Sequence, residues 1–174
     1  IYGGSFRNGK RRDRMIKWYF GHKDPALKVL MFGSINATQF KNGPQITPIP
    51  VFQGAIQNSS FVNKLSTGIA TVHIVDPFYA DHWVTLRFYE ALLAGVVPFI
   101  DWIADKRRKL YFQDSVLEDF LYVKKRAEVA DRIELIKRED CLNEVVDLCK
   151  DSVRSHWDKN QYKEQLKDII MKRL

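Results

Sequence analysis

Residues 68–101 read GIATVHIVDPFYADHWVTLRFYEALLAGVVPFID. The run from Gly68 to Val75 consists almost entirely of small and branched apolar residues, which is typical of a strand buried on both faces. The apolar spacing over 82–94 predicts a helix that Gly95 ends, and Val96–Ile100 predicts a second buried strand. Because two parallel strands need a crossover, usually a helix, this strand–helix–strand order predicts an α/β fold.

The same alternation extends over the rest of the 174 residues. We expect strands at Ile1–Tyr2, Lys28–Phe32, Val51–Phe52 and Phe120–Val123, and helices over 10–20, 57–64, 127–137, 139–154 and 159–173. This order predicts one Rossmann-like parallel sheet with helices on both faces and extra helices at the C-terminus. The length favours a single domain, residues 1–174, and a hydrophobic content of 45% is enough for a core.

The charge and the cysteines restrict the class of protein. A formal charge of +7 permits a polyanionic partner, although a solvated basic surface explains it equally well. Cys141 and Cys149 are predicted to be reduced thiols, which favours a cytoplasmic protein. The histidines have no metal-ligand spacing, and no apolar run is long enough to span a membrane.

Residues 2–14, YGGSFRNGKRRDR, place two glycines and a serine before a cluster of arginines and lysines. Glycines allow the backbone to bend closely around a ligand, and arginine forks match phosphate oxygens. Amides at the start of the following helix also favour an anion. This stretch therefore predicts a phosphate-binding loop. It is neither a Walker loop nor a GxGxxG dinucleotide motif.

Arg87 and Glu90 lie three residues apart on the predicted helix 82–94 and so share a face. The carboxylate could accept hydrogen bonds from the two hydroxyls of a ribose, and the arginine could neutralise a phosphate. The alternative is an ordinary surface ion pair. Ligands of open α/β sheets bind at the carboxyl ends of the strands, where Gly33, Gly54–Ile56 and the loop Asp76–Tyr79 are also expected.

Several separated motifs resemble one family in the same order. The run from Glu90 to Pro98, E-x4-G-x-x-P, is similar to the nucleotide-sugar motif of GT-B glycosyltransferases. The segments YGGSFRNGKR, FKNGP, PVFQGAI, and TLRFYE followed by FID resemble the phage DNA β-glucosyltransferases, as does the helix AEVADRIELIK at 127–137. The resemblance covers the C-terminal, donor-binding domain of that two-domain fold.

The resemblance implies a role for particular residues. It places Gly4, Ser5, Arg7 and Arg11 on the diphosphate of UDP-glucose, Arg87 and Tyr79 on the phosphate side, Glu90 on the ribose, and Ile56 with Gly33 at the uracil. It implies inverting transfer of glucose to 5-hydroxymethylcytosine, or a related hydroxymethylated base, in duplex DNA. The general base belongs to the N-terminal acceptor domain, which this chain lacks, so no catalytic residue is assigned here. We therefore expect the chain by itself to be inactive or weakly active.

The implied partners are a UDP-sugar, duplex DNA and an N-terminal GT-B domain, in the same protein or as a separate chain, with no membrane. A phage-encoded protein of this kind would act in the cytoplasm of the bacterial host. Mg²⁺ or Mn²⁺ is an optional cofactor, for which Asp76 is a candidate ligand and otherwise a turn residue.

Two other functions stay open from the sequence. One is a GT-B glycosyltransferase domain that acts on a lipid, metabolite or glycan, and the other is a basic nucleic-acid-binding module without a donor site. The basic runs Lys106–Lys109 and Lys124–Arg126 could contact DNA, although solvated surface is the commoner explanation. Six aromatic residues are expected to pack in the interior: Trp18, Tyr19, Phe20, Trp83, Phe88 and Tyr89.

Overall fold

The computed structural model describes residues 2–3, 10–21, 27–32, 51–52, 54, 60–76, 78–112 and 115–156, with only the backbone for 2–3, 10–11 and 51–52. In this part of the chain the strands form two three-stranded sheets, ordered β1-β2-β3 and β4-β5-β6. The strands are β1 (Tyr2–Gly3), β2 (Leu30–Phe32), β3 (Val51–Phe52), β4 (Ala70–His73), β5 (Val97–Asp101) and β6 (Tyr122–Val123). Every described pairing is parallel, as the sequence predicts.

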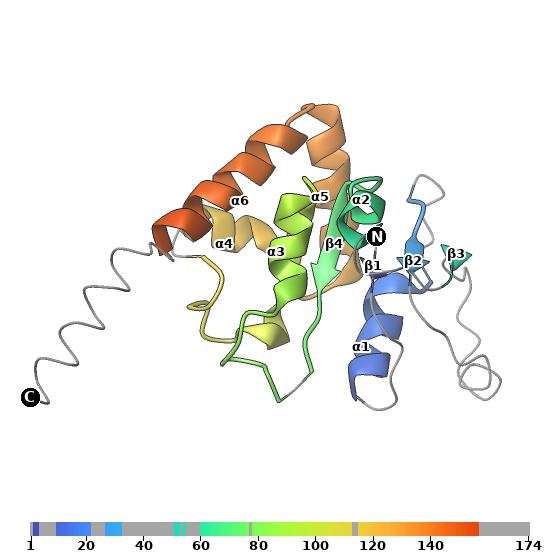
Figure 1. Cartoon of the computed structure of the whole chain (residues 1–174), viewed down its shortest axis with the longest axis horizontal. Helices are drawn as coiled ribbons and strands as arrows, with labels where there is room; N and C mark the ends of the chain where they lie inside the picture. The colour runs from blue at the N-terminus through green and yellow to red at the C-terminus, as the bar shows by residue number, and fades with distance from the viewer. Residues whose placement is uncertain are drawn as a thin grey trace, which may run out of the picture.

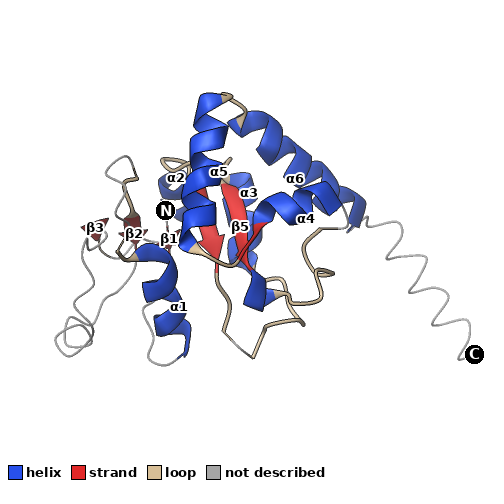
Figure 2. Ribbon diagram, turned by 180° about the vertical axis from the view of Figure 1, so that it is seen from behind, coloured by secondary structure: helices blue, strands red, loops and turns tan. Residues whose placement is uncertain are grey.

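The helices cover the strands from two sides. They are α1 (Lys10–Tyr19), α2 (Phe61–Leu65), α3 (Leu86–Leu93), α4 (Ser115–Leu121), α5 (Arg126–Arg138) and α6 (Leu142–His156), with a 3₁₀ turn at Trp102–Ala104. Helix α3 lies in front of the strands in Figure 1, whereas α5 lies behind them there and faces the viewer in the opposite view of Figure 2. Helices α3 and α6 contact each other and β5. The α/β class is therefore confirmed.

Strand β5 lies at the centre of its sheet, and all five of its residues are buried. It pairs with β4 from Ala70 opposite Val97 to His73 opposite Ile100. A strand covered on both faces needs apolar side chains in succession rather than in alternation. This requirement explains the sequence Val97–Ile100, and it makes β5 the core of the molecule.

Helices α1 and α5 share the other face, where polar contacts connect them. The hydroxyl of Tyr19 donates to the carbonyl of Val72 at 2.7 Å and accepts from the Val72 amide at 2.7 Å. Arg126, the first residue of α5, donates through Nε and Nη2 to the carbonyl of Lys17 and through Nη1 to that of Gly21. Its guanidinium thus satisfies carbonyls at the end of α1, which have no partner within their own helix.

Most predicted elements are confirmed within one to four residues of their ends, including the stop of α3 at Gly95, whose φ of 71° favours glycine. Helix α4 is an element that the sequence pattern did not predict, because it is short and follows a polar loop. The predicted helix 139–154 begins later, at Leu142, since Asp140 adopts a φ of 51° and ends the preceding helix. The predicted helix 159–173 lies outside the described residues.

The expected packing of the aromatic residues is mostly confirmed. Trp18, Tyr19, Phe20 and Phe88 are buried. The expectation for Trp83 is wrong, because 64% of this residue is exposed on the loop between β4 and α3. Both cysteines are free thiols, Cys149 buried and Cys141 partly buried. Among the described helices, none combines the length and the apolar character that crossing a bilayer requires.

Candidate donor site

The carboxyl ends of β4 and β5 form the edge of the sheet at which the candidate site lies. Strand β4 ends at His73, and a loop then leads to α3, which begins at Leu86 after its N-cap residue Thr85. Helix α3 returns across the sheet to β5, so its N-terminal turn lies at this edge. Arg87 lies in this turn and Glu90 one turn later on the same face, and the positive end of the helix dipole also favours an anionic ligand here.

Arg87 and Glu90 form an ion pair in this position. The distance from Arg87 Nη1 to Glu90 Oε2 is 2.7 Å, and the Glu90 side chain is only 17% exposed. The guanidinium of Arg87 also lies 3.8 Å from the ring centroid of Phe61, the first residue of α2, in a cation–π contact. Phe61 and Glu90 therefore hold Arg87 from two sides, and the pair is more buried than an ordinary surface ion pair.

Arg14 connects the basic N-terminal cluster to the same edge. Its Nη1 donates to the carbonyl of Val75, just beyond the end of β4, at 3.2 Å. Arg11 lies three residues earlier in α1, where only its backbone is described. Arg14 belongs to the predicted phosphate-binding stretch, but the sequence did not indicate a role for it. Its spacing of three from Arg11 was the signal that could have indicated this contact.

The loop Asp76–Tyr79 is a tight turn. The amide of Phe78 donates to Asp76 Oδ1 at 3.1 Å, and the amide of Tyr79 donates to the Asp76 carbonyl at 2.9 Å. This Asx turn matches the turn interpretation of Asp76. Within the described residues no three His, Cys, Asp or Glu side chains gather to hold a metal. A divalent ion at Asp76 would therefore need the oxygens of the diphosphate and water as its other ligands, a mode common for Mg²⁺.

The structure brings together only some of the predicted site residues. Arg87 and Glu90 are in contact, Tyr79 is 44% exposed on the adjoining loop, and α1, which contains Arg11, is anchored to the end of β4. The other predicted donor-binding residues lie outside the described residues, namely Gly4, Ser5, Arg7, Gly33 and Ile56.

Buried polar groups behind this edge were not predicted from the sequence. Asp105 is 1% exposed, and its Oδ2 accepts hydrogen bonds from the Tyr122 hydroxyl at 2.5 Å and the Leu110 amide at 2.8 Å. Burial, and next the hydrogen bond to Asp105, raise the pKa of Tyr122 above its ordinary value. Burial also raises the pKa of Tyr111. Both hydroxyls therefore stay protonated, which suits a structural role rather than acid–base chemistry.

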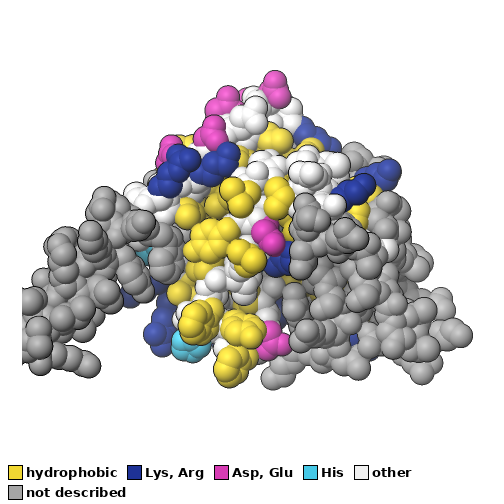
Figure 3. Space-filling model, in the orientation of Figure 1, with side chains coloured by type: hydrophobic (Ala, Val, Ile, Leu, Met, Phe, Trp, Pro, Cys, Tyr) yellow, Lys and Arg dark blue, Asp and Glu magenta, His cyan; other side chains and the backbone are white. Residues whose placement is uncertain are grey.

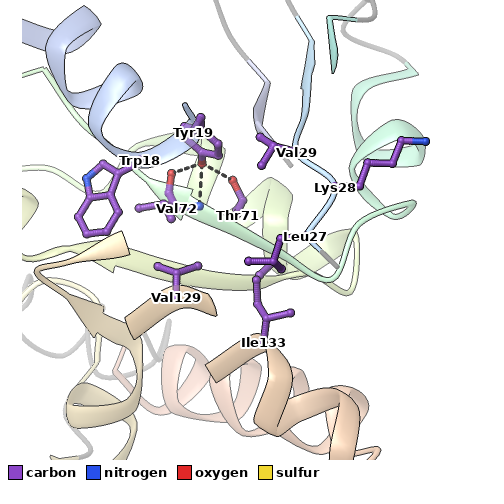
Figure 4. A pocket seen from close by; sticks show the side chains of 10 residues that line it. Trp18, Tyr19, Leu27, Lys28, Val29, Thr71, Val72, Val129 and Ile133 are labelled. Carbon is purple, nitrogen blue, oxygen red and sulfur yellow. Dashed lines mark hydrogen bonds between the residues drawn. The ribbon is translucent and has the colours of Figure 1, made fainter. Parts of the chain in front are cut away.

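A small cavity lies at the opposite, amino edge of the strands (Figure 4). Its volume is about 50 Å³, far below the several hundred Å³ of a typical nucleotide pocket. The lining is mainly apolar and comes from α1, α5, β4 and the residues before β2: Trp18, Tyr19, Leu27, Lys28, Val29, Ala70, Thr71, Val72, Val129 and Ile133. We interpret it as a gap in the packing between α1 and α5, separate from the candidate donor site.

Comparisons with known proteins point to one kind of enzyme. The chain is 36% identical over 144 residues to the DNA β-glucosyltransferase of Enterobacteria phage T4. The aligned region covers 82% of this chain and 38% of that protein. A structure of a mutant of the T4 enzyme in complex with UDP-glucose superposes with a TM-score of 0.75 at 34% identity, over 96% of this chain and 46% of the other. The T4 enzyme in complex with UDP and Mn²⁺ gives a TM-score of 0.77 at 32% identity, with the same coverage of both chains.

No protein-family profile matches the chain. The chain spans less than half the length of the relatives it matches. Within that span the match is high in both sequence and structure, and it agrees with the resemblance that the separated motifs indicated. The chain is therefore similar, in sequence and in fold, to part of the phage T4 DNA β-glucosyltransferase, a glycosyltransferase of the GT-B type.

Proposed function

We propose that this chain is the donor-binding half of an inverting DNA glucosyltransferase that uses UDP-glucose. The observation that carries the proposal is the Arg87–Glu90 pair at the carboxyl edge of the sheet, in a chain 36% identical to a DNA β-glucosyltransferase. The acceptor is the hydroxymethyl group of 5-hydroxymethylcytosine, or of a related base, in duplex DNA. Residues 1–174 act as one nucleotide-sugar-binding domain in the cytoplasm of a bacterial host.

The charge of each side chain decides which part of the donor it binds. Glu90 keeps Oε1 without a hydrogen-bond partner among the described residues, so this oxygen is available to the ribose hydroxyls. Arg87, with Arg7, Arg11, Gly4 and Ser5, binds the diphosphate and stabilises the negative charge that develops as glucose leaves.

The remaining parts of the reaction are assigned to neighbouring groups. Tyr79 lines the phosphate side, and Ile56 with Gly33 contacts the uracil. A divalent ion held by the diphosphate and Asp76 would add positive charge. The general base that deprotonates the acceptor hydroxyl comes from an N-terminal GT-B domain. The coverage of only 46% of a relative's chain supports this division. Alone, the chain is expected to bind the donor and to turn it over weakly or not at all.

Binding of UDP tests the donor site directly. A ligand that binds only the folded chain raises its melting temperature, so UDP is expected to shift the Tm upward with concentration. Glu90→Gln removes a charged acceptor from the ribose and should weaken UDP binding about tenfold or more by calorimetry. Arg11→Ala should also weaken it, through loss of a phosphate contact.

Two controls accompany these variants. Glu134→Gln on the exposed side of α5 makes the same chemical change away from the edge, and Lys124→Ala removes a cation outside the assigned site. Both should bind UDP like the unaltered chain. Absence of any Tm shift with UDP would contradict the proposed function. Once the companion domain is supplied, glucose transfer to hydroxymethylated but not to plain duplex DNA would distinguish this enzyme from one with a non-DNA acceptor.

A further inference from the structure

Two exposed loops meet at the carboxyl edge beside the candidate donor site. The first precedes α3 and presents Phe78 and Trp83, which are 76% and 64% exposed. The second follows β5 and presents Lys106, Arg107 and Lys109, all exposed. We call these five residues the aromatic–basic surface. Figure 3 shows hydrophobic side chains gathered at the lower tip of the molecule, with a histidine and lysine or arginine side chains beside them.

Two hydrogen bonds join the loops, although 25 residues separate their ends in the sequence. The amide of Asp81 donates to the carbonyl of Ala104 at 2.9 Å, and the amide of Lys106 donates to Asp81 Oδ1 at 2.5 Å. Asp81 and Arg108 have φ angles of 63° and 52°, a conformation that non-glycine residues rarely adopt. The two loops therefore lie side by side in a defined arrangement, so the loop that carries the aromatic residues adjoins the loop that carries the basic ones.

The basic side chains of this surface are available to a ligand. Arg108 is paired with Asp119 at 2.7 Å, whereas no described carboxylate pairs with Lys106, Arg107 or Lys109. Three neighbouring cations with which no described carboxylate pairs favour a polyanion over an apolar protein surface. The exposed rings beside them offer flat faces on which a nucleobase can stack, and cations combined with aromatic faces are the usual means of binding unstacked nucleic acid.

We propose that the aromatic–basic surface contacts the DNA acceptor, with Lys106, Arg107 and Lys109 on the phosphate backbone and Phe78 and Trp83 against bases at the modified position. This inference rests on the proposed function and adds an acceptor contact to the donor half. The geometry suits the chemistry, because both loops leave the same edge of the sheet at which Arg87 and Glu90 lie.

The test measures binding of the full chain to a fluorescent duplex that contains hydroxymethylcytosine, by anisotropy at several salt concentrations. Lys106→Ala with Arg107→Ala should reduce the slope of log K against log salt by about 1 to 2, roughly one for each phosphate contact. The matched control is Lys64→Ala with Lys137→Ala, which removes the same charge from exposed sites on α2 and α5 and should leave the slope unchanged.

Phe78→Ala with Trp83→Ala should weaken DNA binding by about fivefold or more when the target base of the duplex is mispaired. The same variant should weaken binding to a fully paired duplex by less. Leu148→Ala, an exposed apolar residue on α6, is the control. The UDP-induced Tm shift of the Lys106→Ala with Arg107→Ala variant, and of Trp83→Ala alone, should match that of the unaltered chain, because none of these three residues belongs to the donor site.

Four outcomes would overturn the proposal: no DNA binding by the unaltered chain at low salt, an unchanged slope in the lysine–arginine variant, an unchanged affinity in the aromatic variant, or a dimer that only the aromatic variant dissociates. The last outcome would assign the surface to a second copy of the chain. If the unaltered chain binds UDP in any of these cases, the donor proposal stands while the acceptor inference fails.

Discussion

Asp105 determines the shape of the basic loop at the level of a single residue. Its side chain accepts the amide of Leu110 and the hydroxyl of Tyr122, while its own carbonyl accepts the amide of Arg108 at 3.3 Å. These bonds close the turn that carries Lys106 to Lys109 and attach it to β6. Such donors offset the cost of burying a carboxylate that is 1% exposed, although both of them bind Oδ2, and Oδ1 has no hydrogen-bond partner among the described residues.

Replacement of Asp105 tests this role. Asp105→Ala leaves the Leu110 amide and the Tyr122 hydroxyl buried without their acceptor, so we expect a loss of about 2–4 kcal/mol in the free energy of unfolding. Urea denaturation measures it. Asp119→Ala, which removes a 78% exposed partner of Arg108, should cost less than about 1 kcal/mol. Equal losses for the two variants would show that the buried acceptor is not needed.

Arg87 makes one contact that the local sequence predicts, with Glu90, and one that it does not. Their contact could be predicted because helix geometry places residues three apart on one face, and the structure confirms the pair. The contact of Arg87 with Phe61 could not be predicted. It depends on the packing of α2 against α3, which their separate sequences do not specify.

At the level of elements, one arginine joins α1 to α5. Three N–H groups of Arg126 contact Lys17 and Gly21, which lie 109 and 105 residues earlier in the sequence. The side chain caps the end of α1 and so fixes the helix that begins with the basic cluster. The position of the N-terminal half of the candidate site thus depends on a residue in the second half of the chain.

Arg126→Ala should therefore lower the free energy of unfolding by about 1.5–3 kcal/mol, because charged hydrogen bonds to two carbonyls are lost. Arg126→Lys should recover only part of the loss, since an ammonium group lacks the planar fork that reaches both carbonyls. The control Arg138→Ala removes a side chain that is 70% exposed and paired with its neighbour, with an expected effect below about 0.5 kcal/mol. Chemical denaturation compares the three, and a similar stability for all of them would exclude the capping role.

For the whole molecule, the buried acids predict a loss of stability at alkaline pH. Burial raises the pKa of Cys149 to about 12 and also raises the pKa values of Tyr111 and Tyr122. These groups stay neutral in the folded chain but ionise in the unfolded chain near pH 8.5 for the cysteine and near pH 10 for the tyrosines. Their contribution is therefore complete below the unfolded pKa and is lost as the pH rises towards the folded pKa.

We expect the free energy of unfolding to fall above about pH 9, by up to about 1.4 kcal/mol per pH unit for each group that has begun to ionise in the unfolded state. Urea titrations at pH 7, 9 and 10.5 measure the slope. Tyr122→Phe should make the slope between pH 9 and 10.5 shallower, even though its stability at pH 7 is lower. A slope identical to that of the unaltered chain would show that Tyr122 titrates alike in both states.

The sequence by itself determined the order of strands and helices, the buried character of β4 and β5, and the face shared by Arg87 and Glu90. These properties follow from periodicity and composition within one segment, so neighbouring residues contain the necessary information. The motifs also indicated the related enzymes. Helix α4 was not predicted, because a seven-residue helix has too few turns for a periodic signal.

Only the tertiary structure decided which loops meet. It exposed Trp83, joined Asp81 to Lys106, buried Asp105 under Tyr122 and anchored Arg14 at the end of β4. Each of these contacts depends on how complete elements pack, because residues far apart in sequence become neighbours only when apolar faces are buried together. The donor-site pair and the basic run Lys106–Lys109 were therefore visible in the sequence, whereas only the folded chain places that run beside the loop that carries Phe78 and Trp83.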